Sequence, residues 1–252
     1  MTQQVAPSEV ARIFDAELRD SDARTLEQLG PRYNVAPTQP LTVVTQRDDG
    51  RFVEAHRWGL VPPWSERASG AAASRMINAR AESVARSPAF RASFLRRRCL
   101  VPADGFYEWR REAGRRRPQP FLIAPRSGTG PLAMAGLWAP WRDPASGDWL
   151  LTAAVVTTRA NATVGVLHDR MPVLLAPDEW PIWLDRRITD ADFLADLLRP
   201  APDALLELRP VSRRLNSPHN EGAELLVPEP DAEATVPLTL FALGSAPATG
   251  RG

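Results

Sequence analysis

The sequence predicts an α+β fold built mainly on antiparallel β-sheet, with helices at the periphery. Apolar, β-branched segments typical of strands are concentrated in the middle of the chain, whereas segments with helical spacing lie mostly toward its ends. The two kinds of segment do not alternate as strand, helix and strand, which is the order that parallel α/β folds require. The sequence also shows no repeat of fixed period, so a solenoid or propeller is not expected.

The expected strands are bounded by Gly, Pro and Asp residues, which favour turns between them. They span residues 41–45, 52–60, 99–110, 120–124, 132–138, 149–158 and 206–211.

Helical periodicity predicts an amphipathic helix over residues 8–18, where apolar side chains recur at intervals of three and four. A Ser-Pro pair at residues 87–88 is typical of an N-cap followed by a first-turn proline, and it predicts a short helix after it. Further helices are expected over residues 178–184 and 189–198.

The domain organisation follows from a change in composition near the C-terminus. Residues 1–227 contain no linker-like stretch and are expected to form a single domain. Residues 228–252 are rich in Pro, Ala, Gly and acidic residues, which predicts a disordered tail.

Composition excludes several classes of protein. The chain has 252 residues, 44% of them hydrophobic, which is enough to bury a substantial core. It has no apolar run of the roughly 18 residues that a membrane span needs. The N-terminus lacks the basic and apolar regions of a secretory signal, and Cys99 is the single cysteine. We therefore expect a cytoplasmic protein with no disulfide and no membrane association.

The formal net charge is +1, but the charge is unevenly distributed. Residues 86–117 carry ten arginines against three acidic residues, a local charge of +7. A patch of this kind can bind a polyanion even on a nearly neutral protein. The arginine run at residues 115–117 is equally typical of a solvated surface loop.

The chain contains no lysine, because all 31 basic residues are arginines. Its only primary amine is therefore the α-amino group at the N-terminus. Any chemistry that joins an amine to a carbonyl compound has to use that group.

Histidine and cysteine give weak signals when taken alone. Three scattered histidines and one cysteine offer no ligand-pair spacing, so no metal site is expected. A protease pair of Cys99 and His168 is conceivable, but Cys99 lies in an apolar run that reads as a buried strand. His56 and His219 are interpreted as structural, and a lone His168 favours the same interpretation.

Eight segments, however, closely resemble the SRAP family, the "SOS response-associated peptidase" domain proteins, both in their amino-acid sequence and in their order along the chain. The resemblance covers nearly all of residues 8–227. The segments are RYNVAPTQ at 32–39, WGLVPPW at 58–64, INARAES at 77–83, CLVPADGFYEW at 99–109, AGLW at 135–138, VVTTRAN at 155–161, HDRMPVLL at 168–175 and VSRRLNSPHNEGAEL at 211–225.

The resemblance implies a single SRAP-like domain with an open barrel, and a protein that acts in the DNA damage (SOS) response. Members bind abasic sites in single-stranded DNA and form a covalent DNA–protein crosslink there. The family nucleophile is a cysteine exposed as residue 2 when the initiator methionine is removed. Its amine forms an imine with the abasic aldehyde, and its thiol then closes a thiazolidine ring, for which the shared carbon frame gives a high effective molarity.

The resemblance also implies catalytic roles for three residues of this chain. Glu108 would act as the acid/base that opens the sugar ring, and His168 would help to form and reverse the imine. Asn78 would hold the aldehyde-derived oxygen or the N-terminus by hydrogen bonds. No cofactor or metal is implied, and we expect a monomer whose partner is abasic single-stranded DNA.

Five further residues are assigned to DNA binding by the same resemblance. Arg80 and Arg170 would hold flanking phosphates as bidentate donors. Trp64 would stack on, or wedge beside, an exposed base. Asn34 and Pro37 would line the pocket.

The beginning of the chain departs from the family pattern of Met-Cys-Gly-Arg. Here Met1, Thr2, Gln3 and Gln4 precede the first helix, and about four to six residues are missing relative to the pattern. The intact remaining segments favour a start further upstream over a divergent member that has lost its thiol. The shortened N-terminus is not expected to reach the pocket. Two alternatives stay open at this point, a non-catalytic single-stranded DNA-binding module and an (auto)peptidase.

Overall fold

A computed structural model describes residues 1–68, 76–111, 113–114, 116–126 and 130–228. The expected disordered tail, residues 228–252, lies outside this part of the chain except for its first residue, and so do Glu112 and Arg115 of the expected basic patch.

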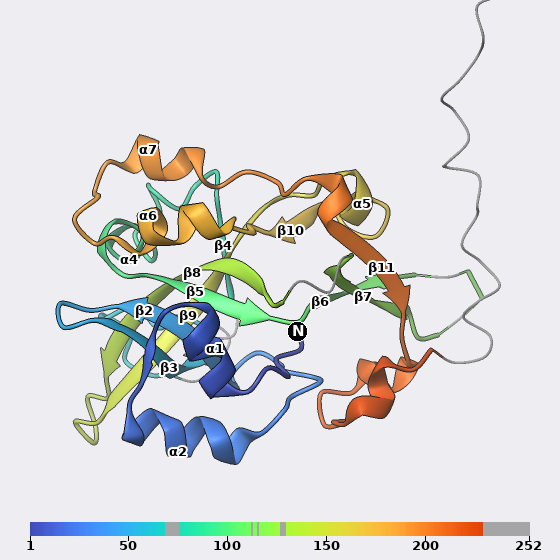
Figure 1. Cartoon of the computed structure of the whole chain (residues 1–252), viewed down its shortest axis with the longest axis horizontal. Helices are drawn as coiled ribbons and strands as arrows, with labels where there is room; N and C mark the ends of the chain where they lie inside the picture. Colours follow the sequence, from blue (N-terminus) through green and yellow to red (C-terminus); the bar gives the residue numbers. More distant parts are fainter. Residues whose placement is uncertain (69–75, 112, 115, 127–129, 229–252) are drawn as a thin grey trace, which may run out of the picture.

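A closed, mixed β-barrel forms the centre of the molecule (Figure 1). Neighbouring strands pair antiparallel in the order β3-β2-β5-β8-β9, and β9 returns to β3 through a parallel pairing. This parallel seam joins Arg57 to Thr152 and Trp58 to Ala153. The barrel strands are β2 (Pro40–Gln46), β3 (Arg51–Trp58), β5 (Arg98–Ala103), β8 (Leu132–Arg142) and β9 (Trp149–Arg159).

Three short strands extend the barrel sheet. Strand β1 (Glu17–Leu18) pairs parallel with β3, β4 (Asn78–Arg80) pairs parallel with β9, and β10 (Arg170–Pro172) pairs antiparallel with β9. Both β4 and β10 therefore lie beside the C-terminal end of β9.

A second, smaller sheet lies beside the barrel and has the antiparallel order β11-β7-β6. Its strands are β6 (Phe106–Arg110), β7 (Gln119–Pro125) and β11 (Leu206–Pro210). Strands β5 and β6 are joined by a corner at Asp104 and Gly105 and belong to different sheets. A side chain at Gly105 would come within 2.6 Å of the Ile123 carbonyl oxygen, so this corner needs glycine.

Short helices cover the outside of the barrel, and with them the α+β prediction with peripheral helices is confirmed. The α-helices are α1 (Pro7–Ile13), α2 (Asp20–Leu29), α4 (Arg91–Arg96), α5 (Ala162–Gly165), α6 (Trp180–Leu184) and α7 (Ala191–Asp196), and the 3-10 helices are η1 (Pro177–Glu179), η2 (Asp203–Leu205), η3 (Arg213–Asn216) and η4 (Ala223–Leu226).

Two predicted elements were wrong in their extent. The helix expected over residues 8–18 ends at Ile13, because Asp15 takes a left-handed conformation with φ of 50° and Leu18 continues into β1. The strand expected over residues 99–110 is divided by the Asp104–Gly105 corner into β5 and β6.

Alternate residues of the barrel strands enter two different apolar clusters. One cluster joins the strands to the helices and contains Leu100 together with Phe94 and Trp183. The other contains Cys99 and Val101 and fills the opposite face of the strands. Cys99 has no exposed surface, and burial raises the pKa of its thiol far above the usual range. It is an inert core residue, as the sequence suggested.

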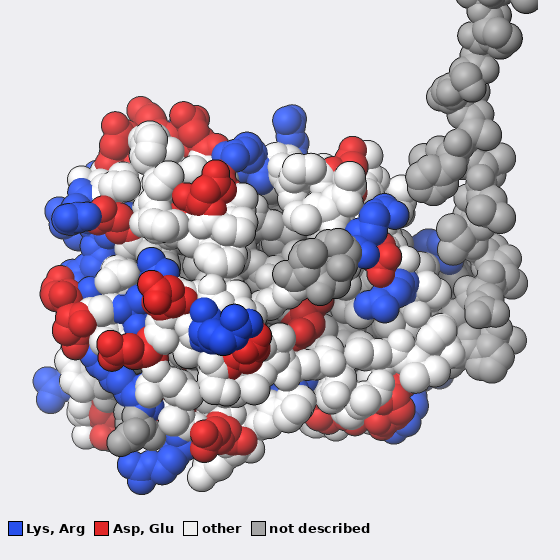
Figure 2. Space-filling view, in the orientation of Figure 1, with Lys and Arg blue, Asp and Glu red and all other residues white. Residues whose placement is uncertain are grey.

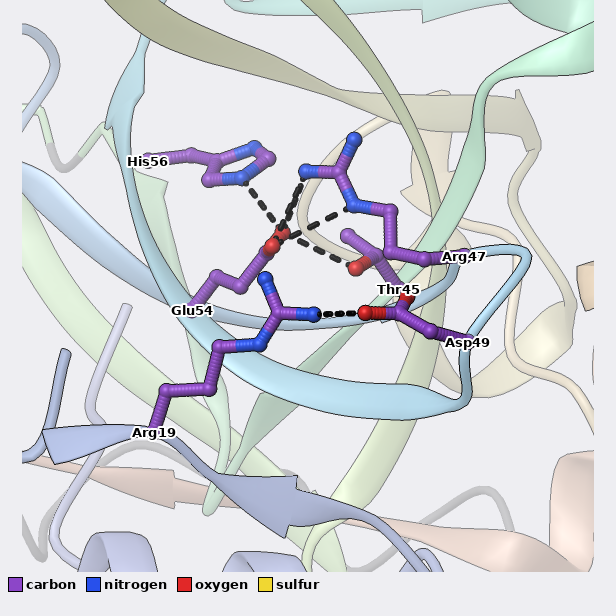
Figure 3. A network of polar contacts seen from close by, with 6 residues as sticks. All are labelled: Arg19, Thr45, Arg47, Asp49, Glu54 and His56. Carbon is purple, nitrogen blue, oxygen red and sulfur yellow. Dashed lines mark hydrogen bonds and ion pairs between the residues drawn. The ribbon is translucent and has the colours of Figure 1, made fainter. Parts of the chain in front are cut away.

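Polar side chains of β2, β3 and the turn between them form a buried network (Figure 3). The Glu54 carboxylate accepts hydrogen bonds from Thr45 Oγ1 at 2.9 Å and from the Arg47 guanidinium at 2.8 Å. His56 Nε2 lies 3.0 Å from the same carboxylate, and burial lowers the pKa of this histidine. A neutral His56 therefore donates its Nε2 proton to Glu54. Burial alone would raise the pKa of Glu54, but the bonds from His56 and Arg47 outweigh it and lower the value to about 2.

We expect the Glu54→Gln variant to lose about 3 kcal/mol of unfolding free energy, because it leaves the partly buried Arg47 without its anion. Urea denaturation at neutral pH measures the loss. A pKa lowered by folding stabilises the protein above the unfolded value of 4.5 and ceases to do so as pH falls toward 2. The difference between wild type and variant should therefore shrink below about pH 4. Glu9→Gln, in the exposed pair with Arg12, is the control and should change nothing measurable.

Candidate active site

A pocket of about 660 Å³ opens where the N-terminus, β6 and β10 come together. Its walls combine side chains from segments that are far apart in the sequence. Those with polar or aromatic groups include Asn34, Trp58, Asn78, Arg80, Tyr107, Glu108, Trp109, His168, Arg170 and Asn216.

Met1 lies inside this pocket, which corrects the expectation that the N-terminus would not reach it. The physical reason is that the residues after Met1 form β-bridges to two different segments of the chain. Thr2 bridges to Gly105 at the β5–β6 corner, and Gln3 bridges to Arg32. The Met1 amino group donates a hydrogen bond to the Val35 carbonyl oxygen at 3.1 Å, and the Val35 amide donates to the Met1 carbonyl at 2.9 Å.

The environment of this amine favours its uncharged form. Burial and the nearby Arg32 guanidinium lower its pKa to about 5, against the opposing charges of Glu108 and Glu221. At neutral pH the amine therefore has a free electron pair and is a nucleophile.

Glu108 lines the same pocket, and its charge acts on this amine. It lies on β6, and burial raises its pKa above the ordinary value of 4.5, although His168 and the amine act in the opposite direction. A carboxyl group with a raised pKa keeps its proton to higher pH, as a general acid must.

His168 has a defined orientation at the pocket rim. Its Nδ1 accepts a hydrogen bond from the Arg170 amide at 3.0 Å and lies 3.3 Å from both the Arg170 carbonyl oxygen and an Asp169 carboxylate oxygen. The side chain is about half exposed, at 49%. His168 thus presents its ring to solvent and to the pocket that it lines.

Asn78 and Arg80 come from β4, where the parallel pairing with β9 places their exposed side chains on the pocket and buries Ala79 between them. Arg170 comes from β10 and is already engaged. Its guanidinium holds both carboxylate oxygens of Glu82, at 2.6 and 3.0 Å. A phosphate at Arg170 would have to share that guanidinium with Glu82.

The remaining predicted residues differ in how they meet the pocket. Asn34 and Pro37 line it, but the Asn34 amide donates to the carbonyls of Ser217 and Asn220, so it braces the wall. Trp64 is 65% exposed and is not among the residues that line the pocket. The pocket thus brings together seven of the eight predicted site residues, all except Trp64.

The family model "SOS response associated peptidase (SRAP)" matches residues 1–218. The chain belongs to the SRAP family. It is 39% identical over 197 residues to the abasic site processing protein YoqW of Bacillus subtilis, covering 78% of this chain and 85% of that one. It is 32% identical over 203 residues to YedK of Escherichia coli, also named an abasic site processing protein, covering 78% and 84% of the two chains.

Solved structures show the same SRAP fold. A protein from Bacteroides thetaiotaomicron aligns with a TM-score of 0.79 at 24% identity, covering 90% of this chain and 98% of that one. A phage-related protein from Bordetella bronchiseptica aligns with a TM-score of 0.63 at 30% identity, covering 84% and 92%.

Residues that sequence reasoning did not assign line this SRAP pocket or support its wall. Trp109 is 40% exposed and lines the pocket next to Glu108. The Glu221 carboxylate accepts hydrogen bonds from the amides of Tyr33 and Asn34 and so fixes the wall that holds the amine. Tyr107 donates to the Tyr33 carbonyl at 2.5 Å on the same wall. All lie within the segments that carried the resemblance, but only the fold shows which of their side chains face the pocket.

Two tests give negative results over the part of the chain that the structure describes. No group of three or more potential metal ligands occurs there. No described helix is long and apolar enough to cross a membrane. A Cys99–His168 pair is not formed either, because Cys99 is buried in the core and does not line the pocket.

Proposed function

We propose that this protein processes abasic sites in single-stranded DNA through covalent chemistry at its N-terminal amine. One observation carries the proposal. The only primary amine of the chain lies in the pocket, uncharged at neutral pH, with the charges of Glu108 and His168 acting on the same site. An abasic deoxyribose offers an aldehyde, which is the electrophile that such an amine attacks. The relatives named abasic site processing proteins support this assignment.

The chemistry can be followed atom by atom. Glu108 donates a proton to the ring oxygen while the C1 hydroxyl loses its own, which opens the sugar to the aldehyde. The amine nitrogen then adds to the aldehyde carbon, and the oxygen becomes a hydroxyl. That hydroxyl leaves as water after protonation, the nitrogen loses its proton, and an imine remains. His168, which lines the pocket, supplies or accepts a proton in the forward and reverse directions.

DNA binding would use the cations and aromatic faces around the pocket. Arg80 is exposed and lines the pocket, which suits it to a phosphate on either side of the lesion. The exposed faces of Trp64 and Trp109 offer stacking surfaces for neighbouring bases. On the face drawn in Figure 2, acidic and basic side chains of the described residues are mixed, so binding would rest on local contacts more than on a global field.

We expect single-stranded DNA to bind more tightly than intact duplex, because stacking needs unpaired bases. The affinity for single strands should fall with salt as condensed counterions are released, with a logarithmic slope of about −0.7 for each phosphate contacted. Fluorescence anisotropy with labelled single and double strands of one sequence, titrated at several salt concentrations, measures both effects. Equal affinity for the two forms without a salt dependence would contradict the proposal.

Arg80→Gln should weaken this binding about tenfold, without changing the rate of imine formation at saturating DNA. Arg209→Gln is the matched control, since Arg209 is exposed on β11 and does not line the pocket. A slower chemical step in the Arg80 variant at saturation would instead place this residue in the reaction itself.

A further inference from the structure

A second basic hollow, of about 400 Å³, lies on the surface of α4 and apart from the pocket. It is lined by Arg91, Arg96 and Arg97 together with Pro88, Ala92 and Leu95. None of these lining residues carries a negative charge. The hollow therefore has three positive charges and no carboxylate in its own wall.

The arginines of this hollow differ from their neighbour Arg98 in how they are engaged. Arg98 is buried and donates hydrogen bonds to five backbone carbonyls, among them those of Phe94 and Trp183, so its role is structural. Arg97 is half-buried, and its Nε has neither exposed surface nor a hydrogen-bond partner among the described residues. An Nε donor in that situation loses hydration without gaining a partner.

The electrostatic surroundings of Arg97 leave its charge uncompensated. Burial and the like charge of Arg186 both lower the pKa of Arg97, and no carboxylate among the described residues acts against them. Arg186 in turn is paired with the exposed Asp48. An anion bound in the hollow would supply the missing counter-charge.

The segment of chain that connects the pocket to the hollow is also positively charged. From β4 to the end of α4, residues 78–97 carry five arginines and one acid, Glu82, which is held by Arg170. Arg80 lines the pocket, and Arg86 follows it on the surface. The eleven residue steps from Arg80 to Arg91 can span at most about 40 Å, within reach of a flexible single strand.

We propose that the α4 hollow, formed by Arg91, Arg96 and Arg97, is a second phosphate-binding site that holds the backbone of the same single strand beyond the abasic site. The proposal rests on the proposed function, because it extends the DNA path that begins at the pocket. Its ligand is the phosphodiester backbone, so it should show no preference for base sequence.

Strand length separates this site from the pocket. An abasic strand of about 5 nucleotides fills only the neighbourhood of the pocket, whereas one of about 30 nucleotides also reaches α4. We compare wild type with the Arg91→Gln/Arg96→Gln/Arg97→Gln variant on both strands. The variant should bind the long strand about tenfold more weakly, with a salt slope reduced by about 2, and should bind the short strand as wild type does.

The control variant removes the same charge elsewhere. Arg12→Gln/Arg142→Gln/Arg209→Gln replaces three exposed arginines that line neither the pocket nor the hollow. An Arg91→Gln/Arg96→Gln variant, which changes only exposed positions, guards against a folding defect from Arg97 and should weaken long-strand binding in the same direction.

The outcomes distinguish the two proposals. If the α4 variant and the control variant bind the long strand equally, the second site is overturned while the abasic-site function stands. If the α4 variant binds both strands equally weakly, the arginines act through the pocket and the second site is overturned as well. If wild type binds neither strand, both proposals fail.

Discussion

Glu108→Gln is expected to slow imine formation with an abasic strand by about 10²–10⁴-fold while leaving DNA affinity within a factor of about three. The amide keeps the size and polarity of the carboxyl group on β6 but cannot donate and recover a proton. The rate is measured by trapping the imine with borohydride in single turnovers at saturating DNA, and the affinity by anisotropy in the same buffer.

The pH profile gives this prediction a second readout. The amine is protonated below about pH 5, so the wild-type rate should fall as pH drops through that value. Glu108 acts as an acid only while it is protonated, and burial extends that range upward from 4.5. The wild-type rate should therefore also fall on the alkaline side, as Glu108 ionises. Glu108→Gln should remove the alkaline fall and keep the acid one.

Glu207→Gln is the matched control, because Glu207 lies on β11 and outside the pocket.

His168→Ala should reduce both the rate of imine formation and the rate of its reversal, since one group serves the two directions. If the DNA affinity of Glu108→Gln or His168→Ala falls strongly while the trapping rate at saturation is unchanged, that residue binds DNA and does not transfer protons.

The strand pattern of the fold could be predicted from the sequence because most barrel strands are apolar runs ended by turn residues. β2 over Pro40–Gln46 and β7 over Gln119–Pro125 each lie within two residues of the expected bounds. Helix α2 was missed because it is mostly polar, and Leu26 is its buried apolar residue. The closure of the barrel was also missed, since it depends on only two residue pairs between β3 and β9.

The residues that belong to the site could be predicted from the amino-acid sequence of the motifs, but the geometry of the site could not. Asn78, Glu108 and His168 come from separate segments, and only the β9 pairings and the β5–β6 corner bring them to one pocket. Sequence reasoning placed Trp64 at the lesion, whereas Trp109 lines the pocket. In the run Glu108-Trp109, period-2 alternation predicts opposite orientations along a strand. The shape of the pocket where the two sheets meet decides that both residues line it.

The position of Met1 is the feature that most changes what is expected of the reaction. Because about four to six residues are missing relative to the family pattern, the sequence predicted that the N-terminus would not reach the pocket. The pairing of Thr2 with Gly105 and of Gln3 with Arg32 holds it inside. The covalent step therefore depends on which groups the first residue carries.

A chain that begins at Met1 is expected to form an imine with an abasic strand that borohydride traps, but no heat-stable crosslink. The amine of Met1 lies in the pocket as a free base, and the thioether of methionine has no proton to give and cannot close a ring onto the imine carbon. Left untrapped, the imine either hydrolyses or promotes β-elimination, which breaks the strand. Denaturing gels with and without borohydride separate these products, and the intact mass of the protein identifies its first residue.

Placing cysteine at position 1 is expected to convert the trapped imine into a heat-stable crosslink. In Met1→Cys, produced behind a removable initiator methionine, the thiol sulfur adds to the imine carbon. Its proton passes to the nitrogen, which gives a closed thiazolidine ring. The expected change is from no heat-stable product to a crosslink on most of the abasic strand.

Met1→Ser is the matched control, since its hydroxyl is a far poorer nucleophile than a thiolate and should give the borohydride-dependent product alone. Acetylation of the N-terminus should abolish both products, because the chain has no other primary amine. An upstream Cys-Gly-Arg start should restore the heat-stable product as well if that cysteine reaches the same pocket. A heat-stable crosslink that survives N-terminal acetylation and maps to an internal residue would show that the nucleophile is not the N-terminal amine. In that case the role assigned to Glu108 beside it would have to be abandoned.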